Sequence, residues 1–344
     1  MISQIKQLCA LEGVSGHEDA VRAYILRTLE ASPAEMEITV DALGSVIARV
    51  RGEKRGEQTV LFAAHMDEVG LIITGITEEG YLRFAAVGGL DPQVLFGKSV
   101  KVNGCTGVVG GKAVHMCTAD EKKTPPSMDK LLIDIGAESR EEAEKLVKPG
   151  DVAAFDSAFT KLESGLFKAK ALDDRAGCAL LLELAGRVPT YDMVIAFTVQ
   201  EEIGLRGAKA VAYAVQPDIA VVVDATTAAD TSGVAPDKQV CRVGDGPVVS
   251  FMDKRTLYDK ELYSCIRRMA EDKGIKAQTK TVIAGGNDAG SIQTERAGVR
   301  VAAVSLPCRY IHSPSCVLSK KDLTATLKLL QLLADTLPAE NKTV

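Results

Sequence analysis

The stretch Thr59-Val-Leu-Phe-Ala-Ala-His-Met-Asp67 combines a short apolar run with a histidine and an aspartate directly after it. An apolar run of this length, bounded by polar residues, predicts a strand that is buried on both faces of a sheet. In open α/β sheets, functional side chains gather beyond the carboxyl ends of the strands. His65 and Asp67 are therefore the first candidates for a functional site.

Similar apolar runs recur later in the chain and alternate with helical patterns. We predict strands at 193–199, 219–223, 278–283 and 301–306, and helices at 175–186, 205–214, 260–273, 289–297 and 323–337. This alternation favours an α/β fold with a mixed, mostly parallel sheet flanked by helices. Residues 68–157 are instead short pieces rich in glycine and valine, which predict an inserted β-barrel-like domain. Residues 1–67 and 158–344 would then form one α/β domain.

The composition excludes several classes of protein. The 344 residues are 46% hydrophobic and 25% charged, which is typical of a globular chain with a large core. A net charge of −5 gives no reason to expect a nucleic-acid or anionic-membrane partner. With no tryptophan and 4% aromatic residues, the chain is poorly equipped to stack on sugars or bases.

The cysteines and the start of the chain bear on the cellular compartment. None of the eight cysteines forms a CxxC pair, which argues against a zinc ribbon or a disulfide scaffold and favours free thiols in a reducing compartment. No run approaches the about 20 apolar residues of a spanning helix. We see no signal peptide and expect a soluble, cytoplasmic protein. Near the N-terminus, Ser15-Gly-His-Glu18 matches a capping box and predicts a helix from His17.

Acidic residues and a second histidine follow the predicted strands or open a helix. They are Asp173-Asp174, Glu201-Glu202, Asp224, Asp288 and His312. Taken singly, each has an ordinary explanation, such as a helix cap, a solvated loop or a turn. Together they are expected at one edge of one sheet, where crowded carboxylates raise one another's pKa values unless cations bind.

The donor types indicate what the cations are. Nitrogen and oxygen ligands without cysteine suit a pair of divalent ions such as zinc, cobalt or manganese. Two such ions about 3.5–4 Å apart acidify a water molecule that can attack a carbonyl. One of the adjacent glutamates could bind metal while the other acts as a general base. Asp67 is well placed to accept the second ring N–H of His65.

Eight segments, in order and over almost the full length, resemble one enzyme family. This is the family of dinuclear-metal aminopeptidases that form tetrahedral dodecamers, whose members are often named glutamyl aminopeptidases and sometimes endoglucanases. The segments are AAHMDEVG (63–70), GGLDPQVLFGK (88–98), LLIDIGAESREEA (131–143), KALDDRAGCALLL (170–182), VQEEIGLRGA (199–208), VVVDAT (221–226), GGNDAG (285–290) and RYIHSP (309–314).

The resemblance implies a fold like that of zinc peptidases and a role for each matched residue. His65 and Asp224 would serve one metal ion, and Glu202 and His312 the other. Asp173 would bridge both ions, with a cis peptide bond to Asp174. Glu201 would be the general acid/base, and Asp67 would orient His65.

The resemblance also implies short peptide substrates and assembly through the insert, as a homo-oligomer that is a dodecamer built from dimers. Asp288 would shape the substrate pocket. Asn287 and Cys316 depart from the family pattern, but the metal ligands are intact.

Three alternatives stay open from the sequence. A metal-dependent deacylase of a small acylated amine would use the same centre, and a panel of free and blocked N-termini would separate the two. A glycoside hydrolase needs two carboxylates but no histidine ligands. A non-catalytic assembly protein would have no use for a free acid such as Glu201 beside a ligand set.

Overall fold

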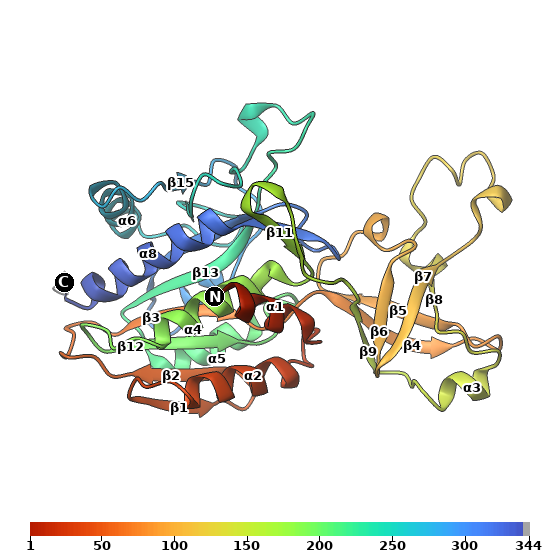
Figure 1. The fold of residues 1–344 in the computed structure, drawn as a ribbon, viewed down its shortest axis with the longest axis horizontal. Coiled ribbons are helices and arrows are strands. Elements are labelled where there is room, and N and C mark those ends of the chain that lie inside the picture. Colours follow the sequence, from red (N-terminus) through yellow and green to blue (C-terminus); the bar gives the residue numbers. More distant parts are fainter. Residues whose placement is uncertain (340–344) are drawn as a thin grey trace.

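The computed structural model describes residues 1–339, which build a helix-covered sheet and a separate barrel (Figure 1). The sheet has eight strands, and its four central strands β12, β3, β13 and β16 are parallel. In spatial order the strands are β1 (Met36–Val40), β2 (Val46–Val50), β12 (Met193–Thr198), β3 (Val60–His65), β13 (Ile219–Thr227), β16 (Arg300–Cys308), β14 (Val248–Val249) and β15 (Gln278–Thr279).

Helices cover both faces of this sheet because alternate residues of the buried strands point to opposite sides. In β3, Phe62 packs into one apolar cluster and Leu61 into the other. The first face carries α1 (Ile2–Ala10), α2 (Asp19–Glu30), α4 (Leu172–Ala185), α6 (Lys260–Asp272) and α8 (Lys320–Thr336). The second face carries α5 (Arg206–Val215) and α7 (Ala289–Ile292).

The chain from β4 to β9 forms the barrel, which stands to one side of the sheet, on the right in Figure 1. Its closed strand order is β4 (Gly70–Ile76), β5 (Leu82–Val87), β8 (Leu132–Asp134), β7 (Cys105–Gly110), β6 (Ser99–Val102) and β9 (Val152–Phe155). The barrel has its own apolar core and one short helix, α3 (Arg140–Glu144). A small sheet of β10 (Thr160–Lys161), β11 (Leu166–Ala169) and β17 (Cys316–Ser319) lies after it in the chain.

The predicted fold class is confirmed, but several element bounds differ. Strand β13 continues to Thr227 because it pairs with β16 along its whole length, so Asp224 lies within a strand rather than after one. Strand β15 ends at Thr279 rather than at 283, so Asp288 does not follow a strand but precedes α7. Helix α7 ends at Ile292 rather than at 297, before Arg296, which has a positive φ of 55°.

None of the helices between residues 1 and 339 combines the length and the apolar character that crossing a bilayer requires. The predicted α/β domain runs to 344, and its last five residues lie outside the described part of the chain.

Candidate active site

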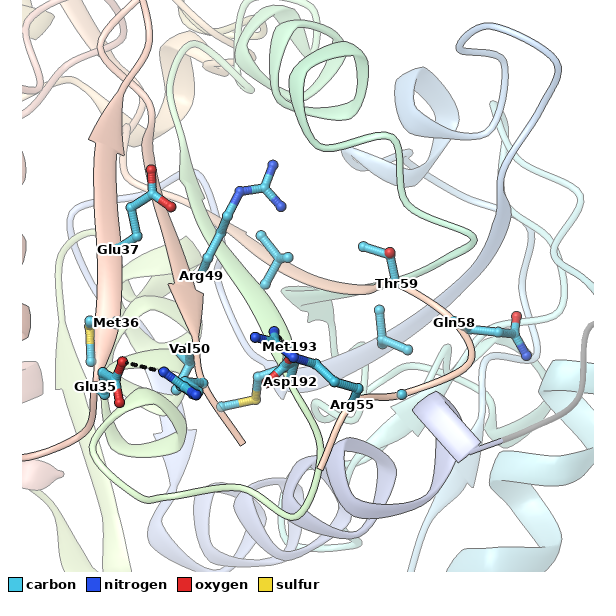
Figure 2. A pocket seen from close by; sticks show the side chains of 14 residues that line it. Glu35, Met36, Glu37, Arg49, Val50, Arg55, Gln58, Thr59, Asp192 and Met193 are labelled. Atoms are coloured by element: carbon cyan, nitrogen blue, oxygen red, sulfur yellow. Dashed lines mark hydrogen bonds and ion pairs between the residues drawn. The ribbon is translucent and has the colours of Figure 1, made fainter. Parts of the chain in front are cut away.

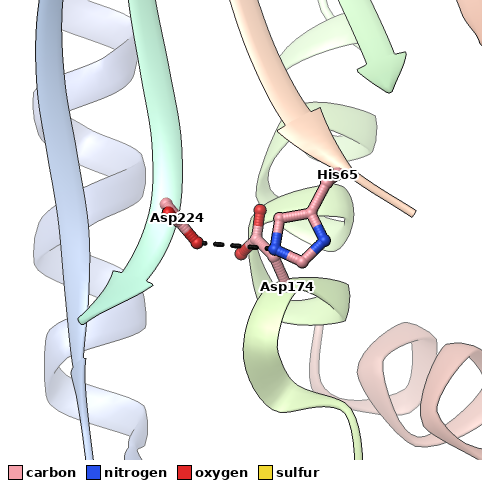
Figure 3. A group of neighbouring side chains, drawn as sticks. All are labelled: His65, Asp174 and Asp224. Atoms are coloured by element: carbon pink, nitrogen blue, oxygen red, sulfur yellow. Dashed lines mark ion pairs between the residues drawn. The ribbon is translucent and has the colours of Figure 1, made fainter. Parts of the chain in front are cut away.

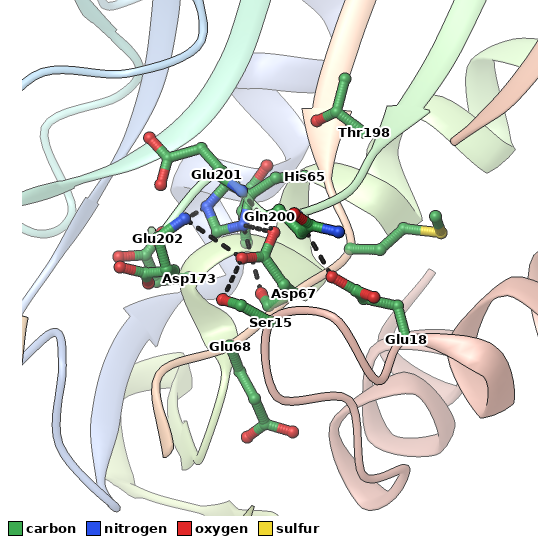
Figure 4. A network of polar contacts seen from close by, with 12 residues as sticks. Ser15, Glu18, His65, Asp67, Glu68, Asp173, Thr198, Gln200, Glu201 and Glu202 are labelled. Atoms are coloured by element: carbon green, nitrogen blue, oxygen red, sulfur yellow. Dashed lines mark hydrogen bonds and ion pairs between the residues drawn. The ribbon is translucent and has the colours of Figure 1, made fainter. Parts of the chain in front are cut away.

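All five predicted metal ligands line one cavity of about 300 Å³ at the carboxyl ends of the parallel strands. His65 ends β3, Asp224 comes from β13, and Asp173 stands in the first turn of α4. The loops that follow β12 and β16 supply the rest, and Glu201 lines the same cavity. Figure 4 shows Asp173 and Glu202 together beside His65. The fold thus brings together residues that are up to 247 positions apart, from His65 to His312.

Asp173 stands between the two histidines. Its Oδ1 lies 3.3 Å from Nε2 of His65, and its Oδ2 lies 3.6 Å from Nε2 of His312. Each histidine has a second carboxylate beside it. Nε2 of His65 is 3.7 Å from Oδ1 of Asp224, and Nε2 of His312 is 3.4 Å from Oε2 of Glu202. One oxygen of Asp173 therefore faces each pair, which is the arrangement that a bridging carboxylate needs.

The peptide bond between Asp173 and Asp174 is cis, as the resemblance implies. The Asp174 carboxylate is fully buried, and its Oδ1 accepts the N–H of Gly177 at 3.0 Å. Its Oδ2 has no hydrogen-bond partner among residues 1–339. A Cβ at position 177 would lie 2.3 Å from this carboxylate, so only glycine fits there. Figure 3 shows Asp174 beside His65 and Asp224, and the three offer ligand atoms within 4.8 Å of one another.

The negative charge of the clustered carboxylates favours the binding of cations. Burial, reinforced by neighbouring carboxylates, raises the pKa values of Glu201 and Glu202 well above that of an ordinary glutamate. Burial opposes protonation of His65, yet its contacts with Asp173, Asp224 and Asp67 raise the pKa of the ring well above its usual value. Within residues 1–339, no lysine or arginine forms an ion pair with these carboxylates. Crowded, buried and unneutralised oxygen donors beside two imidazoles fit divalent metal ions.

Asp67 supports the cluster through more contacts than we predicted. Nδ1 of His65 lies 3.1 Å from the backbone oxygen of Asp67 and 3.4 Å from its Oδ1. The carboxylate also accepts the backbone N–H groups of Glu201 and Glu202, at 3.0 and 3.1 Å. Burial raises the pKa of Asp67, but the contacts with His65 and Ser15 outweigh it and hold the pKa below its usual value. Asp67 therefore contacts the backbone of both glutamates as well as the ring of the histidine.

The predicted capping box at residues 15–18 is wrong. The hydroxyl of Ser15 donates to Oδ2 of Asp67 at 2.5 Å instead of capping α2. The carboxylate of Glu18 accepts the backbone N–H groups of Gly16 and Gln200, at 2.7 and 3.1 Å. Each of the two side chains has a partner that lies next to it only in the folded chain, Asp67 for Ser15 and Gln200 for Glu18.

The barrel reaches the site through the glycine pair that opens the matched segment 88–98, to which the sequence analysis gave no role of its own. The backbone oxygen of Gly89, in the loop after β5, lies 2.8 Å from Nδ1 of His312. A Cβ at Gly88, which has a positive φ of 84°, would lie 2.8 Å from the side chain of Val69. The insert therefore orients one histidine of the site.

Asn287, Asp288 and Cys316 lie at different distances from the cavity. Asn287 lines the cavity, whereas the buried Asp288 lies behind it and accepts the hydroxyl of Thr198 at 2.6 Å. Burial raises the pKa of Asp288 to about 7. Cys316 is buried in β17, where it pairs with Ala169, and belongs to the apolar core.

Comparisons with known proteins agree with this geometry. The family model described as M42 glutamyl aminopeptidase matches residues 44–329. A lysyl aminopeptidase of Pyrococcus furiosus is 32% identical over 97% of this chain and 96% of its own length. An aminopeptidase of the archaeon Desulfurococcus kamchatkensis has a similar structure, with a TM-score of 0.92, 33% identity and coverage of 97% and 94% of the two chains.

A second solved structure adds information on assembly. The TET1 peptidase of Pyrococcus horikoshii, which can assemble into a tetrahedron or a large octahedral shell, matches with a TM-score of 0.86 and 37% identity. The match covers 97% of this chain and 99% of that one. Sequence family, length and fold agree throughout, so the chain belongs to the M42 family of glutamyl aminopeptidases and is a peptide-bond hydrolase.

Proposed function

We propose that this protein is a dinuclear metal-dependent aminopeptidase that removes N-terminal residues from short peptides. The observation that carries the proposal is the position of Asp173, which presents one carboxylate oxygen to each of two histidines. Glu201 lines the same cavity and would serve as the base. A scaffold protein would gain nothing from so many buried acids in one place.

The distances support the ligand set that the resemblance implies. His65 and Asp224 would hold one ion, and His312 and Glu202 the other, with Asp173 between them. Asp174 would add negative charge next to the ion that His65 and Asp224 hold. Zinc and cobalt suit these donors best, and manganese is compatible. When bound, two such ions lower the pKa of a water molecule and polarise the carbonyl of the scissile bond.

Glu201 would move the proton. Its carboxylate lines the cavity, and its backbone N–H is held by Asp67 at 3.0 Å. The raised pKa brings this acid closer to the neutral range, in which a group can both accept and return a proton. Glu201 would accept the proton of the attacking water and deliver it to the amine that leaves.

We also propose that the barrel, predicted as the insert 68–157, mediates assembly into a homo-oligomer, specifically a dodecamer built from dimers. Two observations support this. The barrel has a core of its own, apart from the sheet. The similar peptidase of Pyrococcus horikoshii can assemble into closed shells. Molecular mass by light scattering, for the full chain and for a chain without the barrel, tests this assignment.

Metal removal tests the proposed activity. Dialysis against a chelator should abolish the hydrolysis of aminoacyl anilides, and zinc or cobalt should restore it. Hydrolysis that survives complete metal removal would contradict the dinuclear mechanism. The same panel should include N-acylated substrates, because cleavage of blocked substrates alone would point to a deacylase. Release of reducing sugar from polysaccharides by the pure protein would revive the glycoside hydrolase alternative.

A further inference from the structure

A second pocket, which we call the side pocket, adjoins the active-site cavity. It has a volume of about 480 Å³ and lies between α5 and α7, on the second face of the sheet. Gly204, Leu205 and Arg255 line both spaces, so the two meet at these residues. Leu205 has a positive φ of 58°, a backbone conformation that in non-glycine residues is concentrated at functional sites. Two adjoining spaces suit a substrate that extends beyond the first.

The side pocket carries a net positive charge. Its ionisable side chains are Lys209 and Arg255, which are cations, and Glu295, which is an anion. Both cations are open to solvent. Among residues 1–339, no carboxylate forms an ion pair with Lys209 or Arg255. The side pocket is therefore better suited to an anion than to a cation.

Arg255 is held firmly where the two spaces meet. Its backbone N–H donates to Oδ1 of Asp253 at 2.7 Å, and the buried Asp253 also accepts the hydroxyl of Tyr258 at 2.6 Å. The stem of the arginine packs between two glycines. A Cβ at Gly286 would lie 3.1 Å from its Cγ and Cδ, and a Cβ at Gly290 would lie 2.9 Å from its Cβ. A guanidinium on so constrained a stem loses little conformational freedom when it binds a planar carboxylate.

We propose that Arg255, assisted by Lys209, binds the C-terminal carboxylate of short peptides in the side pocket, so that the enzyme recognises both ends of its substrate. This inference rests on the proposed aminopeptidase function, which places the N-terminal residue and the scissile bond in the active-site cavity. The residues that follow would pass Leu205 into the side pocket. A guanidinium and a carboxylate form paired, charge-assisted hydrogen bonds, whereas a C-terminal amide offers no charge. Because Arg255 lies at a fixed place relative to the metal ligands, one peptide length should fit best.

Peptide acids and peptide amides of the same sequence test the proposal. The peptides would be alanine extensions, of increasing length, of the N-terminal residue that the anilide panel favours. At one length, we expect the zinc-loaded protein to cleave the acid with a kcat/KM at least about tenfold higher than that of the amide, since hydrogen bonds to charged groups are the stronger class. The gain should lie in KM, because the contact is the same before and during the reaction. Equal kcat/KM values for acid and amide at every length would overturn the proposal.

An acidic side chain is the other source of a carboxylate. A peptide amide that ends in aspartate should be cleaved like the alanyl amide of the same length. Cleavage as efficient as that of the free acid would assign the side pocket to acidic side chains and overturn the assignment to the C-terminus.

Substitutions test whether the preference comes from the side pocket. Arg255→Gln should lower the acid-to-amide ratio of kcat/KM by about tenfold at the favoured length. Glu295→Gln should raise the ratio, because it removes a negative charge from the pocket. The control Lys276→Gln, at an exposed lysine that pairs with Asp245 outside both spaces, should leave the ratio unchanged. An unchanged ratio in Arg255→Gln would overturn the role of Arg255.

Aminoacyl anilides separate this inference from the proposed function, because they have no C-terminal carboxylate. In Arg255→Gln, the loss of kcat/KM should be about tenfold larger on the peptide acid than on the anilide. An equal loss on both would mean that Arg255 only supports its loop, which overturns the proposal. If the unchanged protein cleaves neither anilides nor peptides, the aminopeptidase function fails and the inference fails with it. Cleavage of both without a preference for the acid removes the inference alone.

Discussion

Two hollows lie at opposite ends of the same sheet, and they differ in how their charges are balanced. The hollow at the amino ends of β3 and β12 is the larger, at about 470 Å³ against about 300 Å³. Two of its three carboxylates have arginine partners, since Arg51 donates to Glu35 at 2.8 Å and Arg55 pairs with Asp192 (Figure 2). In the cavity at the carboxyl ends, the carboxylates are buried and face histidines and one another.

The difference shows that volume does not identify the reactive site. Exposed ion pairs are satisfied as they stand and add at most about 1 kcal/mol to stability. Buried acids without cationic partners raise one another's pKa values and therefore favour the binding of metal ions. The active site therefore differs from the surface hollow because its carboxylates lack lysine or arginine partners.

The largest expected effect contrasts one glutamate from each hollow. Glu201→Gln should lower kcat by about 10²–10⁴, because the general base is lost, while the zinc content stays unchanged. The control Glu35→Gln, in the hollow with paired charges, should change kcat by less than about twofold, within the effect of an exposed ion pair. Steady-state kinetics with metal analysis measures both variants. Near-normal turnover in Glu201→Gln would exclude this residue as the base.

The second prediction contrasts a buried ion pair behind the site with an exposed one. Arg175 is fully buried, donates to the backbone oxygens of Met66 and Leu8 at 2.7 Å each, and lies 3.3 Å from Glu68. Arg175→Met should lower the free energy of unfolding by about 3–5 kcal/mol, because buried partners lose their donor. Arg51→Met, in a pair that is 59% and 72% exposed, should have a much smaller effect on the free energy of unfolding, because water screens the charges. Urea unfolding compares them, and equal losses would contradict the distinction.

The third prediction concerns support of the metal ligands. Asp67→Asn should weaken zinc binding or activity by about 10–100-fold, because an amide cannot accept all the donors that converge on this carboxylate. Asp41 is a matched control, since its Oδ1 accepts three backbone N–H groups away from the site, at 2.8–2.9 Å. Asp41→Asn should leave zinc affinity unchanged. Competition with a chelator measures both, and an unaltered affinity in Asp67→Asn would argue against positioning by Asp67.

The smallest expected effect is on the pH dependence of stability. Burial raises the pKa of Asp230, but two hydrogen bonds from Arg309, at 2.7 Å each, outweigh it and hold the pKa below its usual value. Because the pKa is lowered in the folded state, the ionised Asp230 carboxylate stabilises the protein at pH values above the pKa of an unfolded aspartate, about 3.9. That contribution is lost as the pH falls through the lowered pKa.

Asp230→Asn tests this sign. Its deficit in unfolding free energy should be about 1 kcal/mol or less at pH 7 and should shrink below about pH 4. The control Asp120→Asn, in a pair whose aspartate is 90% exposed, should show no such trend. A deficit that stays constant from pH 7 to pH 3 would contradict the stabilising role of the Asp230 charge.

Local sequence patterns were sufficient to identify those site residues that lie at the end of a strand or at the start of a helix. His65 and Glu202 follow apolar runs, and Asp173 opens a helix, so the donors were visible one by one. Patterns failed where a contact joins distant segments. The bond between Ser15 and Asp67 spans 52 residues, and the contact between Gly89 and His312 spans 223. No local rule connects such pairs, which is why Ser15 was assigned to a helix cap.

By itself, the sequence determined the kinds of donors, their association with buried strands, and the alternation that makes an α/β sheet. Those properties depend on nearest neighbours along the chain, because burial and backbone geometry repeat over a few residues. Only the tertiary structure decided that Asp173 faces both histidines and that Asp67 accepts the backbone N–H groups of both glutamates. Such facts depend on which strands lie side by side, and that order arises when distant segments pack into a common core.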